Sequence, residues 1–153
     1  MGEKEEYRGL SASLGVNVGT SRIKGVILDG LELAHELEMT ISRPRNTCML
    51  WKSLRSFFRE LLREYPLTNV AALSISGRSP TLVGLRKRSR KGPVLGWGAP
   101  ASDEKEGDSL FMDSLAAKLK GLDARLYDDS VFFLNPHEYL SYMLTGMAFS
   151  STP

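Results

Sequence analysis

Residues 14–29, in which two apolar runs meet at a short polar turn, constrain the fold of this chain more than any other segment. The first run leads into Gly19-Thr20-Ser21, and the second begins immediately after it. Such a turn between two strands brings backbone N–H groups and hydroxyls together, a combination that can bind phosphate oxygens. Lys24 adds a positive charge near the same point. The segment therefore predicts a hairpin with a candidate phosphate site. The alternative is an ordinary buried hairpin whose glycine serves only the turn.

The composition is typical of one soluble globular domain. The chain has 153 residues, of which 42% are hydrophobic and 25% charged, and this length is enough for a substantial core. Residues 1–91 hold 16 Lys and Arg against 9 Asp and Glu, whereas residues 92–153 hold 4 against 9. This asymmetry favours either pairing of the two parts or an anionic ligand on the first part.

The sequence indicates a cytoplasmic protein. Cys48 is the only cysteine, which excludes an internal disulfide and fits a reducing compartment. The first residues are charged and lack the apolar core of a signal peptide. No apolar run approaches the length of a membrane span.

The first half of the chain predicts three strands, a helix and further strands. The three strands occupy about 13–19, 22–29 and 31–41, with Asp29-Gly30 as a hairpin turn between the last two. Apolar residues then recur at helical spacing from a Thr47 cap to Tyr65. Strands follow at 70–76 and 80–85.

The second half predicts two helices and one extended segment. The first helix begins at Asp108 or Ser109 and ends at Gly121, and residues 125–133 are expected to be extended. The last helix begins with Asn135 as its cap and ends at Gly146. Strand-strand-strand-helix-strand is the order of a ribonuclease H-like α/β domain, a mixed sheet that opens with three antiparallel strands and has helices packed on it. Nucleases and ATPases share this order, so it does not select a function.

Two polar features have competing interpretations. Residues 86–91 carry five basic side chains in six positions. We interpret this run as a solvated hairpin turn, and an anion-binding or partner-binding patch is the alternative. His137 and Glu138 resemble a catalytic pair, but helix capping explains Glu138 better.

Three segments in the same order resemble the N-terminal half of FGGY-family carbohydrate kinases, members of the actin-like ATPase superfamily. They are the hairpin at 15–29, the strand-turn-strand segment from Val70 that continues to Trp97, and the helix Asn135-Pro-His-Glu-Tyr-Leu-Ser-Tyr-Met-Leu-Thr-Gly. The resemblance spans most of the chain. It identifies residues 12–153 as a single domain, incomplete relative to the family, behind a solvated lead-in at residues 1–11.

The resemblance implies ATP-dependent phosphoryl transfer to a sugar or polyol hydroxyl, with Mg²⁺ and with both substrates bound in a cleft between two domains. Gly19, Thr20, Ser21 and Lys24 match the cofactor-binding hairpin of the family. Arg78 and Ser79 occupy the turn that reaches the sugar, with Arg78 in place of a frequent glutamine. Arginine still offers several hydrogen-bond donors to hydroxyl groups.

The chain departs from the family at the positions that carry the chemistry. Asn17 stands where the family has the aspartate that helps place the metal, and Mg²⁺ prefers carboxylates to amides. After Trp97 the family's aspartate and arginine are missing. The family's general base, second phosphate motif and adenosine motif have no counterpart here. Binding of ATP and Mg²⁺ by this chain alone is therefore expected to be weak or absent, and no catalytic or metal-ligating residue is assigned.

Four functions are compatible with this pattern to different degrees. The first is a truncated or degenerate kinase domain that is inactive alone, and the second is one half of a split kinase whose other half is a separate chain, with a homo-oligomer as the alternative to such a partner. The third is a noncatalytic interaction module on the same fold. The fourth, a ribonuclease H-like nuclease, needs clustered carboxylates, and Asn17 argues against it. A partner surface is expected at Trp97, Pro80 and the Leu82-Val83 strand. Nucleic acid and membrane are not expected as partners.

Overall fold

A computed structural model describes residues 12–65, 70–78, 81–87, 89, 91–96 and 112–148, with backbone alone at 112–114. The predicted lead-in at residues 1–11 lies outside this range. Among the described helices, none is long and apolar enough to cross a membrane.

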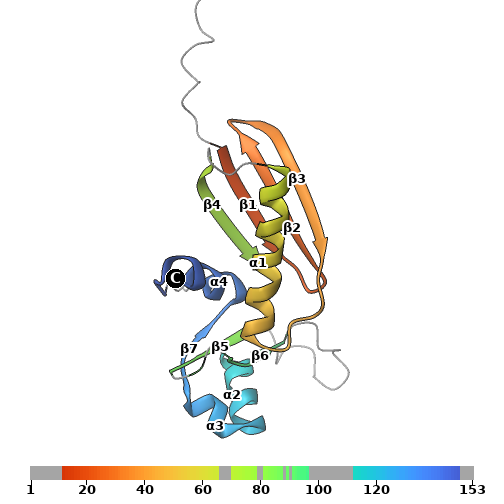
Figure 1. Ribbon diagram of the computed structural model, residues 1–153. Coiled ribbons are helices and arrows are strands. Elements are labelled where there is room, and N and C mark those ends of the chain that lie inside the picture. The colour runs from red at the N-terminus through yellow and green to blue at the C-terminus, as the bar shows by residue number, and fades with distance from the viewer. Residues whose placement is uncertain are drawn as a thin grey trace, which may run out of the picture.

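A four-stranded mixed sheet and one long helix form the larger part of the molecule (Figure 1). Its elements are β1 (Ala12–Val18), β2 (Arg22–Asp29), β3 (Glu32–Thr40), β4 (Val70–Gly77) and helix α1 (Thr47–Glu64). The strand order is β3-β2-β1-β4, with β1 antiparallel to β2 and parallel to β4. The predicted antiparallel opening and mixed sheet are confirmed.

The core lies between this sheet and α1. Side chains alternate along β1 and β2, so that one face of each strand is buried, while α1 buries residues at spacings of three and four. The fully or almost fully buried members are Leu14, Val16, Val18, Ile23, Ile27, Leu50, Leu54, Phe57 and Leu61. The other face of the sheet carries polar residues such as Asn17 and Lys24, which remain exposed.

The cap of α1 differs from the prediction. Asn46, rather than Thr47, is the N-cap, and its side-chain oxygen accepts a hydrogen bond from Met49 N at 3.1 Å. The Thr47 hydroxyl instead accepts a hydrogen bond from Gly92 N at 2.7 Å. Both residue types are good caps, and the distant glycine decides between them.

A smaller three-stranded sheet and three helices form the rest. The elements are β5 (Leu82–Arg86), β6 (Val94–Leu95), α2 (Met112–Leu122), α3 (Ala124–Asp128), β7 (Ser130–Leu134) and α4 (Pro136–Thr145). The antiparallel pairing of β5 with β6 confirms a hairpin across the basic run, and β7 pairs with the other edge of β5.

The extended segment predicted at 125–133 is wrong in its first half. Asp123 accepts a hydrogen bond from Leu126 N at 2.9 Å and begins the short helix α3, so extended structure starts at Ser130. Helix α2 also continues to Leu122, past the expected end at Gly121.

The predicted ends of α4 are confirmed. Glu138 accepts a hydrogen bond from Asn135 N at 2.7 Å, as a capping box requires. Gly146 ends the helix in the left-handed conformation with φ of 74°. Tyr139 fixes α4 to the start of α1, because its buried hydroxyl donates to Thr47 O at 3.3 Å. Burial raises the pKa of Tyr139 to about 12, so this hydroxyl stays a neutral donor.

We expect Gly25→Ala to destabilise the protein by roughly 1–3 kcal/mol, the usual cost of overpacking a core. A Cβ at Gly25 would lie 2.5 Å from Cζ of Phe57, which is fully buried. Gly15→Ala is the matched control on the neighbouring strand, because nothing lies within 4 Å of its Cβ position. Urea unfolding measures both variants. Equal stabilities of the two variants would contradict this account of the core.

Candidate functional site

The turn between β1 and β2 is tight and leaves its hydroxyl residues near the surface. Gly19 N donates to Arg22 O at 2.8 Å, so this N–H group already has a partner within the turn. A Cβ at Gly19 would lie 3.1 Å from Arg22 O, and Gly19 is not among the glycines with positive φ. Glycine therefore suits this position by its lack of a side chain. Thr20 is partly exposed and Ser21 is exposed.

Arg78 lies at the same edge of the sheet as this turn. Strands β1 and β4 are parallel, and their last residues, Val18 and Gly77, face each other. Arg78 follows directly and its N–H donates to Val18 O at 3.2 Å. The Arg78 side chain is exposed. Two candidates from segments about 60 residues apart are thus brought together, while Ser79 lies outside the described residues.

Asn17 is engaged by a residue that the sequence analysis missed. Its side-chain Nδ2 donates to Ser76 Oγ at 2.7 Å, across the parallel pair β1–β4. Ser76 Oγ also lies 3.5 Å from Val16 O, to which it donates. The alternation Ser74-Ile75-Ser76 signalled two hydroxyls on one face of this strand. The parallel register that aligns Ser76 with Asn17 is a tertiary feature.

Lys24 lies on the open face of the sheet but binds carboxylates of β3. Its Nζ is 2.8 Å from Glu36 Oε1 and 3.8 Å from Glu38 Oε2. The hydrogen bond and charge of Glu36 raise the pKa of Lys24, and Lys24 lowers the pKa of Glu36 in return. Arg22 pairs with Glu38 at 2.9 Å in the same way. The charge of Lys24 is therefore largely balanced by its own sheet.

The described residues of this site do not form a metal centre. In the described part of the chain no group of three or more His, Cys, Asp and Glu is placed to hold an ion. Asn17 offers one neutral amide oxygen where Mg²⁺ favours carboxylates. The hydroxyls of Thr20 and Ser21 and the guanidinium of Arg78 are hydrogen-bond donors.

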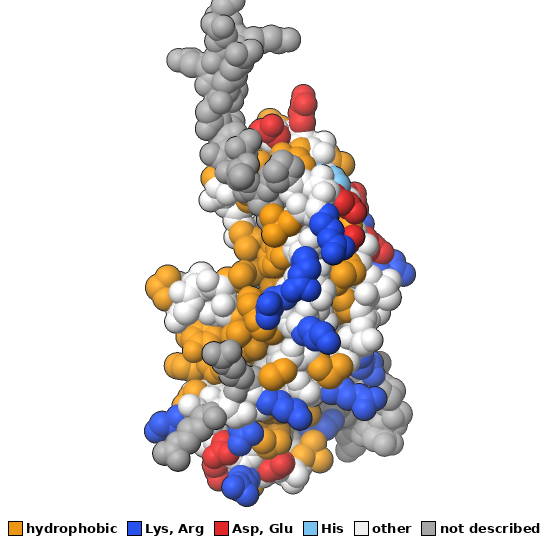
Figure 2. Space-filling model, in the orientation of Figure 1, with side chains coloured by type: hydrophobic (Ala, Val, Ile, Leu, Met, Phe, Trp, Pro, Cys, Tyr) orange, Lys and Arg blue, Asp and Glu red, His pale blue; other side chains and the backbone are white. Residues whose placement is uncertain are grey.

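The exposed apolar surface is not where the sequence placed it. Leu82 and Val83 are fully buried, which contradicts their assignment to a partner surface, and Pro80 and Trp97 lie outside the described residues. Large apolar side chains are exposed instead on β4, β7 and the end of α4, and Figure 2 shows apolar side chains gathered on this side of the molecule. They are Leu73, Val131, Phe132, Leu144 and Met147.

Comparison with known proteins shows similarity in structure and none in the sequence searches. The sequence matches no protein-family model and no curated protein. A xylulose kinase from Brucella ovis matches with a TM-score of 0.73 and 20% identity over 88% of this chain and 34% of that chain. A xylulose kinase from Rhodospirillum rubrum matches with a TM-score of 0.70 and 13% identity over 90% of this chain and 35% of that chain.

A gluconate kinase from Lactobacillus acidophilus also matches, with a TM-score of 0.60 and 16% identity over 90% of this chain and 34% of that chain. This chain thus spans about a third of the length of the solved kinases that it matches. At these identities the similarity establishes the fold, and it confirms the fold that the resemblance implied. The chain has the actin-like ATPase fold found in these FGGY-family sugar kinases.

Proposed function

We propose that this chain is the N-terminal domain of a carbohydrate kinase, formed by residues 12–153, and that it contributes the phosphate-binding hairpin of the active site. The observation that carries the proposal is the convergence of the Gly19–Ser21 turn and Arg78 at the carboxyl ends of two parallel strands. Ligands of open α/β sheets bind at such strand ends. The similarity in fold to xylulose and gluconate kinases supports the proposal independently.

Each candidate residue has a role that its position permits. Thr20 and Ser21 supply hydroxyl and backbone donors to the phosphates of ATP, and the missing side chain of Gly19 lets the phosphates approach the turn. Arg78 donates hydrogen bonds to hydroxyls of a sugar or polyol, and Ser79, which lies outside the described residues, is proposed for the same role from the sequence alone. Lys24 is half exposed and has a flexible stem, so its ammonium can exchange Glu36 for a phosphate oxygen.

The site is suited to binding and positioning rather than to complete catalysis. Phosphoryl transfer depends on positioning, on a metal and on a base for the accepting hydroxyl. The Asn17 amide does not fit a magnesium site, so Mg²⁺ would enter with the nucleotide rather than reside on this domain. We therefore expect this chain alone to bind ATP weakly and not to turn over sugar.

The exposed apolar surface favours a function within an assembly. Leu73, Phe132 and Met147 come from three elements and are each between two fifths and three fifths exposed. Apolar surface of this kind commonly marks interaction sites. A separate kinase half or a second copy of this chain would cover it, and a noncatalytic module on the same fold would use it to bind another protein.

We expect the chain to bind ATP with a Kd near or above roughly 1 mM, equivalent to about 4 kcal/mol. Gly19→Val should abolish this binding, because its side chain crowds both the turn and the approaching phosphate. Gly15→Ala, on the open face of β1, is the control and should bind as wild type does. Amide NMR titrations with ATP measure all three. Identical responses of wild type and Gly19→Val would contradict a phosphate-binding turn.

We expect Asn17→Asp to increase the affinity for Mg-ATP on the order of tenfold, the value of one charge-assisted contact. The new carboxylate adjoins the Ser76 hydroxyl, which can donate to it, and supplies the ligand type that Mg²⁺ prefers. Titrations with Mg-ATP and with ATP in EDTA separate the metal from the nucleotide. A gain that is equal with and without Mg²⁺ would show that the carboxylate does not act through the metal.

We expect Lys24→Met to return the pKa of Glu36 to about its ordinary value, because Lys24 is the group that lowers it. Because the pKa of Glu36 is lowered in the folded protein, its ion pair with Lys24 is intact above the ordinary carboxyl pKa. The pair is lost as pH falls through the pKa that Glu36 has in the folded protein. The raised pKa of Lys24 means loss at the alkaline end, as pH rises through that value. A carboxyl NMR titration of Glu36 measures this. Arg22→Met is the control, since Arg22 binds Glu38, and an unchanged Glu36 pKa in Lys24→Met would contradict the pairing.

A further inference from the structure

A pocket of about 510 Å³ lies apart from the phosphate hairpin, where the start of α1, the β5–β6 hairpin and helices α2 and α3 meet. Arg45, Arg86 and Lys91 line it. Arg86 and Lys91 belong to the basic run at residues 86–91, and the fold brings Arg45 to them from a segment about 40 residues away. The pocket volume is within the usual range of small-molecule sites.

Two hydrogen bonds between Thr47 and Gly92 fix the backbone near two of these cations. Thr47 N donates to Gly92 O at 3.1 Å, and Gly92 N donates to the Thr47 hydroxyl at 2.7 Å. Gly92 is also packed so closely on Gly84 that a Cβ would overlap the Gly84 carbonyl oxygen. Arg45 lies two residues before Thr47 and Lys91 directly precedes Gly92, so this contact fixes the backbone from which two of the pocket-lining cations extend.

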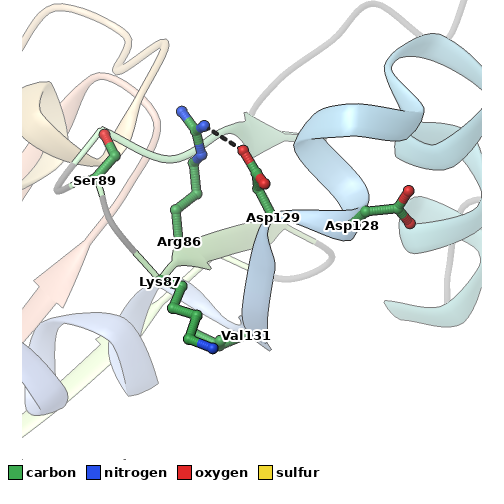
Figure 3. Close-up of a pocket in the computed structure, with 6 residues that line it drawn as sticks. All are labelled: Arg86, Lys87, Ser89, Asp128, Asp129 and Val131. Carbon is green, nitrogen blue, oxygen red and sulfur yellow. Dashed lines mark hydrogen bonds and ion pairs between the residues drawn. The ribbon is translucent and has the colours of Figure 1, made fainter.

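The positive charge of the pocket is only partly neutralised within the described residues. Arg86 donates to Asp129 at 2.6 Å. Figure 3, a close-up of a second pocket that Arg86 also lines, shows its side chain directed toward this carboxylate, while Lys87 leaves the strand end in another direction. Arg45 and Lys91 are exposed and form no ion pair with the described residues. The acidic residue of the lining is Asp123, and its carboxylate already caps α3. Unpaired cations around a concave surface concentrate an attractive potential for anions.

The other walls of the pocket are apolar. Leu95, Leu119, Leu122 and Leu126 line it from β6, α2 and α3. Leu119 is buried, whereas Leu122 is 69% exposed, a high value for a leucine at the edge of a hollow. The pocket therefore combines a cationic side with an apolar side, which is the arrangement that binds an amphipathic molecule.

We propose that this pocket binds a small organic anion, with a carboxylate or phosphate group on Arg45 and Lys91 and an apolar body on the leucine wall. The basic run at residues 86–91 then has a function beyond that of a solvated turn, because Arg86 and Lys91 are its first and last members. An extended polyanion would use the charges but not the leucine wall. The site does not depend on the proposed kinase function, since no residue of the β1–β2 hairpin proposed to bind phosphate lines it.

Phenyl phosphate and benzoate are suitable probes, with phenol as the uncharged analogue and inorganic phosphate as the anion without an apolar body. Amide NMR titrations of the full chain follow the signals of Leu95, Leu119 and Leu126. We expect saturable shifts with at least one of the two organic anions, and at least about tenfold weaker binding of phenol and of inorganic phosphate. Whichever of phenyl phosphate and benzoate binds more tightly shows whether the pocket prefers a phosphate or a carboxylate ligand.

The double variant Arg45→Ala, Lys91→Ala tests the cations, and both residues are exposed, so the fold should persist. We expect affinity for the better probe to fall at least about tenfold, the loss of one to two charge-assisted hydrogen bonds. Lys52→Ala, which removes an exposed cation of α1 outside the pocket, should leave the affinity unchanged. Leu122→Ser should weaken the binding of the organic anion and leave the binding of inorganic phosphate unchanged.

Several results would overturn the proposal. The first is the absence of saturable shifts with both organic anions. The second is that phenol or inorganic phosphate binds as tightly as the better organic anion. The third is that Lys52→Ala loses as much affinity as the Arg45→Ala, Lys91→Ala double variant. Tighter binding of a short oligonucleotide than of either probe, with no effect of Leu122→Ser, would assign the patch to a polyanion instead. Gly19→Val should not change phenyl phosphate binding at these leucines, so the two sites are tested separately.

Discussion

Strand β1 pairs on both of its edges, and these two pairings position the core and the candidate site. β1 is antiparallel to β2 and parallel to β4, and its four buried side chains, Ala12, Leu14, Val16 and Val18, belong to the core under α1. The antiparallel pair creates the tight turn at Gly19, and the parallel pair brings the end of β4 beside it. The candidate site is a consequence of these two registers, because neither pairing alone places Arg78 next to the turn.

The contact between Thr47 and Gly92 has a similar role for the second half of the chain. It joins the first residue of α1 to the β5–β6 hairpin through two hydrogen bonds, and Tyr139 adds a third contact from α4 to the same residue. The smaller sheet is thereby attached to the start of the long helix. Arg45 and Lys91 are close in sequence to these two residues and line the same pocket, so the contact that connects the two sheets also positions the cationic side of the pocket.

Electrostatics distinguish the two candidate sites. On the open face of the sheet, Arg22 and Lys24 alternate with Glu36 and Glu38, and the charges are balanced across neighbouring strands. Exposed pairs of this kind contribute little to stability, but they reduce the positive potential that a phosphate group would meet at the hairpin. In the pocket beside α2 and α3, Arg45 and Lys91 lack such partners among the described residues. The stronger attraction for a small anion is therefore expected at the pocket rather than at the hairpin.

Helices and strands with local sequence signals could be predicted from the amino-acid sequence. The apolar alternation at 14–29 predicted the hairpin, the helical spacing after Thr47 predicted α1, and Asn135, Glu138 and Gly146 predicted both ends of α4. These signals lie within a few residues of the structure that they produce. The short helix α3 was missed although Asp123 is a good cap, because the apolar residues that follow it favoured an extended segment.

The hydrogen-bond or ion-pair partner of each polar side chain could not be predicted in this way, because it depends on the folded arrangement of distant segments. Thr47 was predicted as a helix cap, but its hydroxyl accepts a hydrogen bond from Gly92, 45 residues away. Lys24 was predicted to bind phosphate, and it forms an ion pair with Glu36 of the next strand. Ser76 meets Asn17 through a parallel register, and Leu82 and Val83 are buried under elements that come later in the chain. The physical reason is that hydrogen bonds and ion pairs act over a few ångströms in space. Local patterns fix the backbone of single elements, whereas strand register and packing fix which distant groups come within that range.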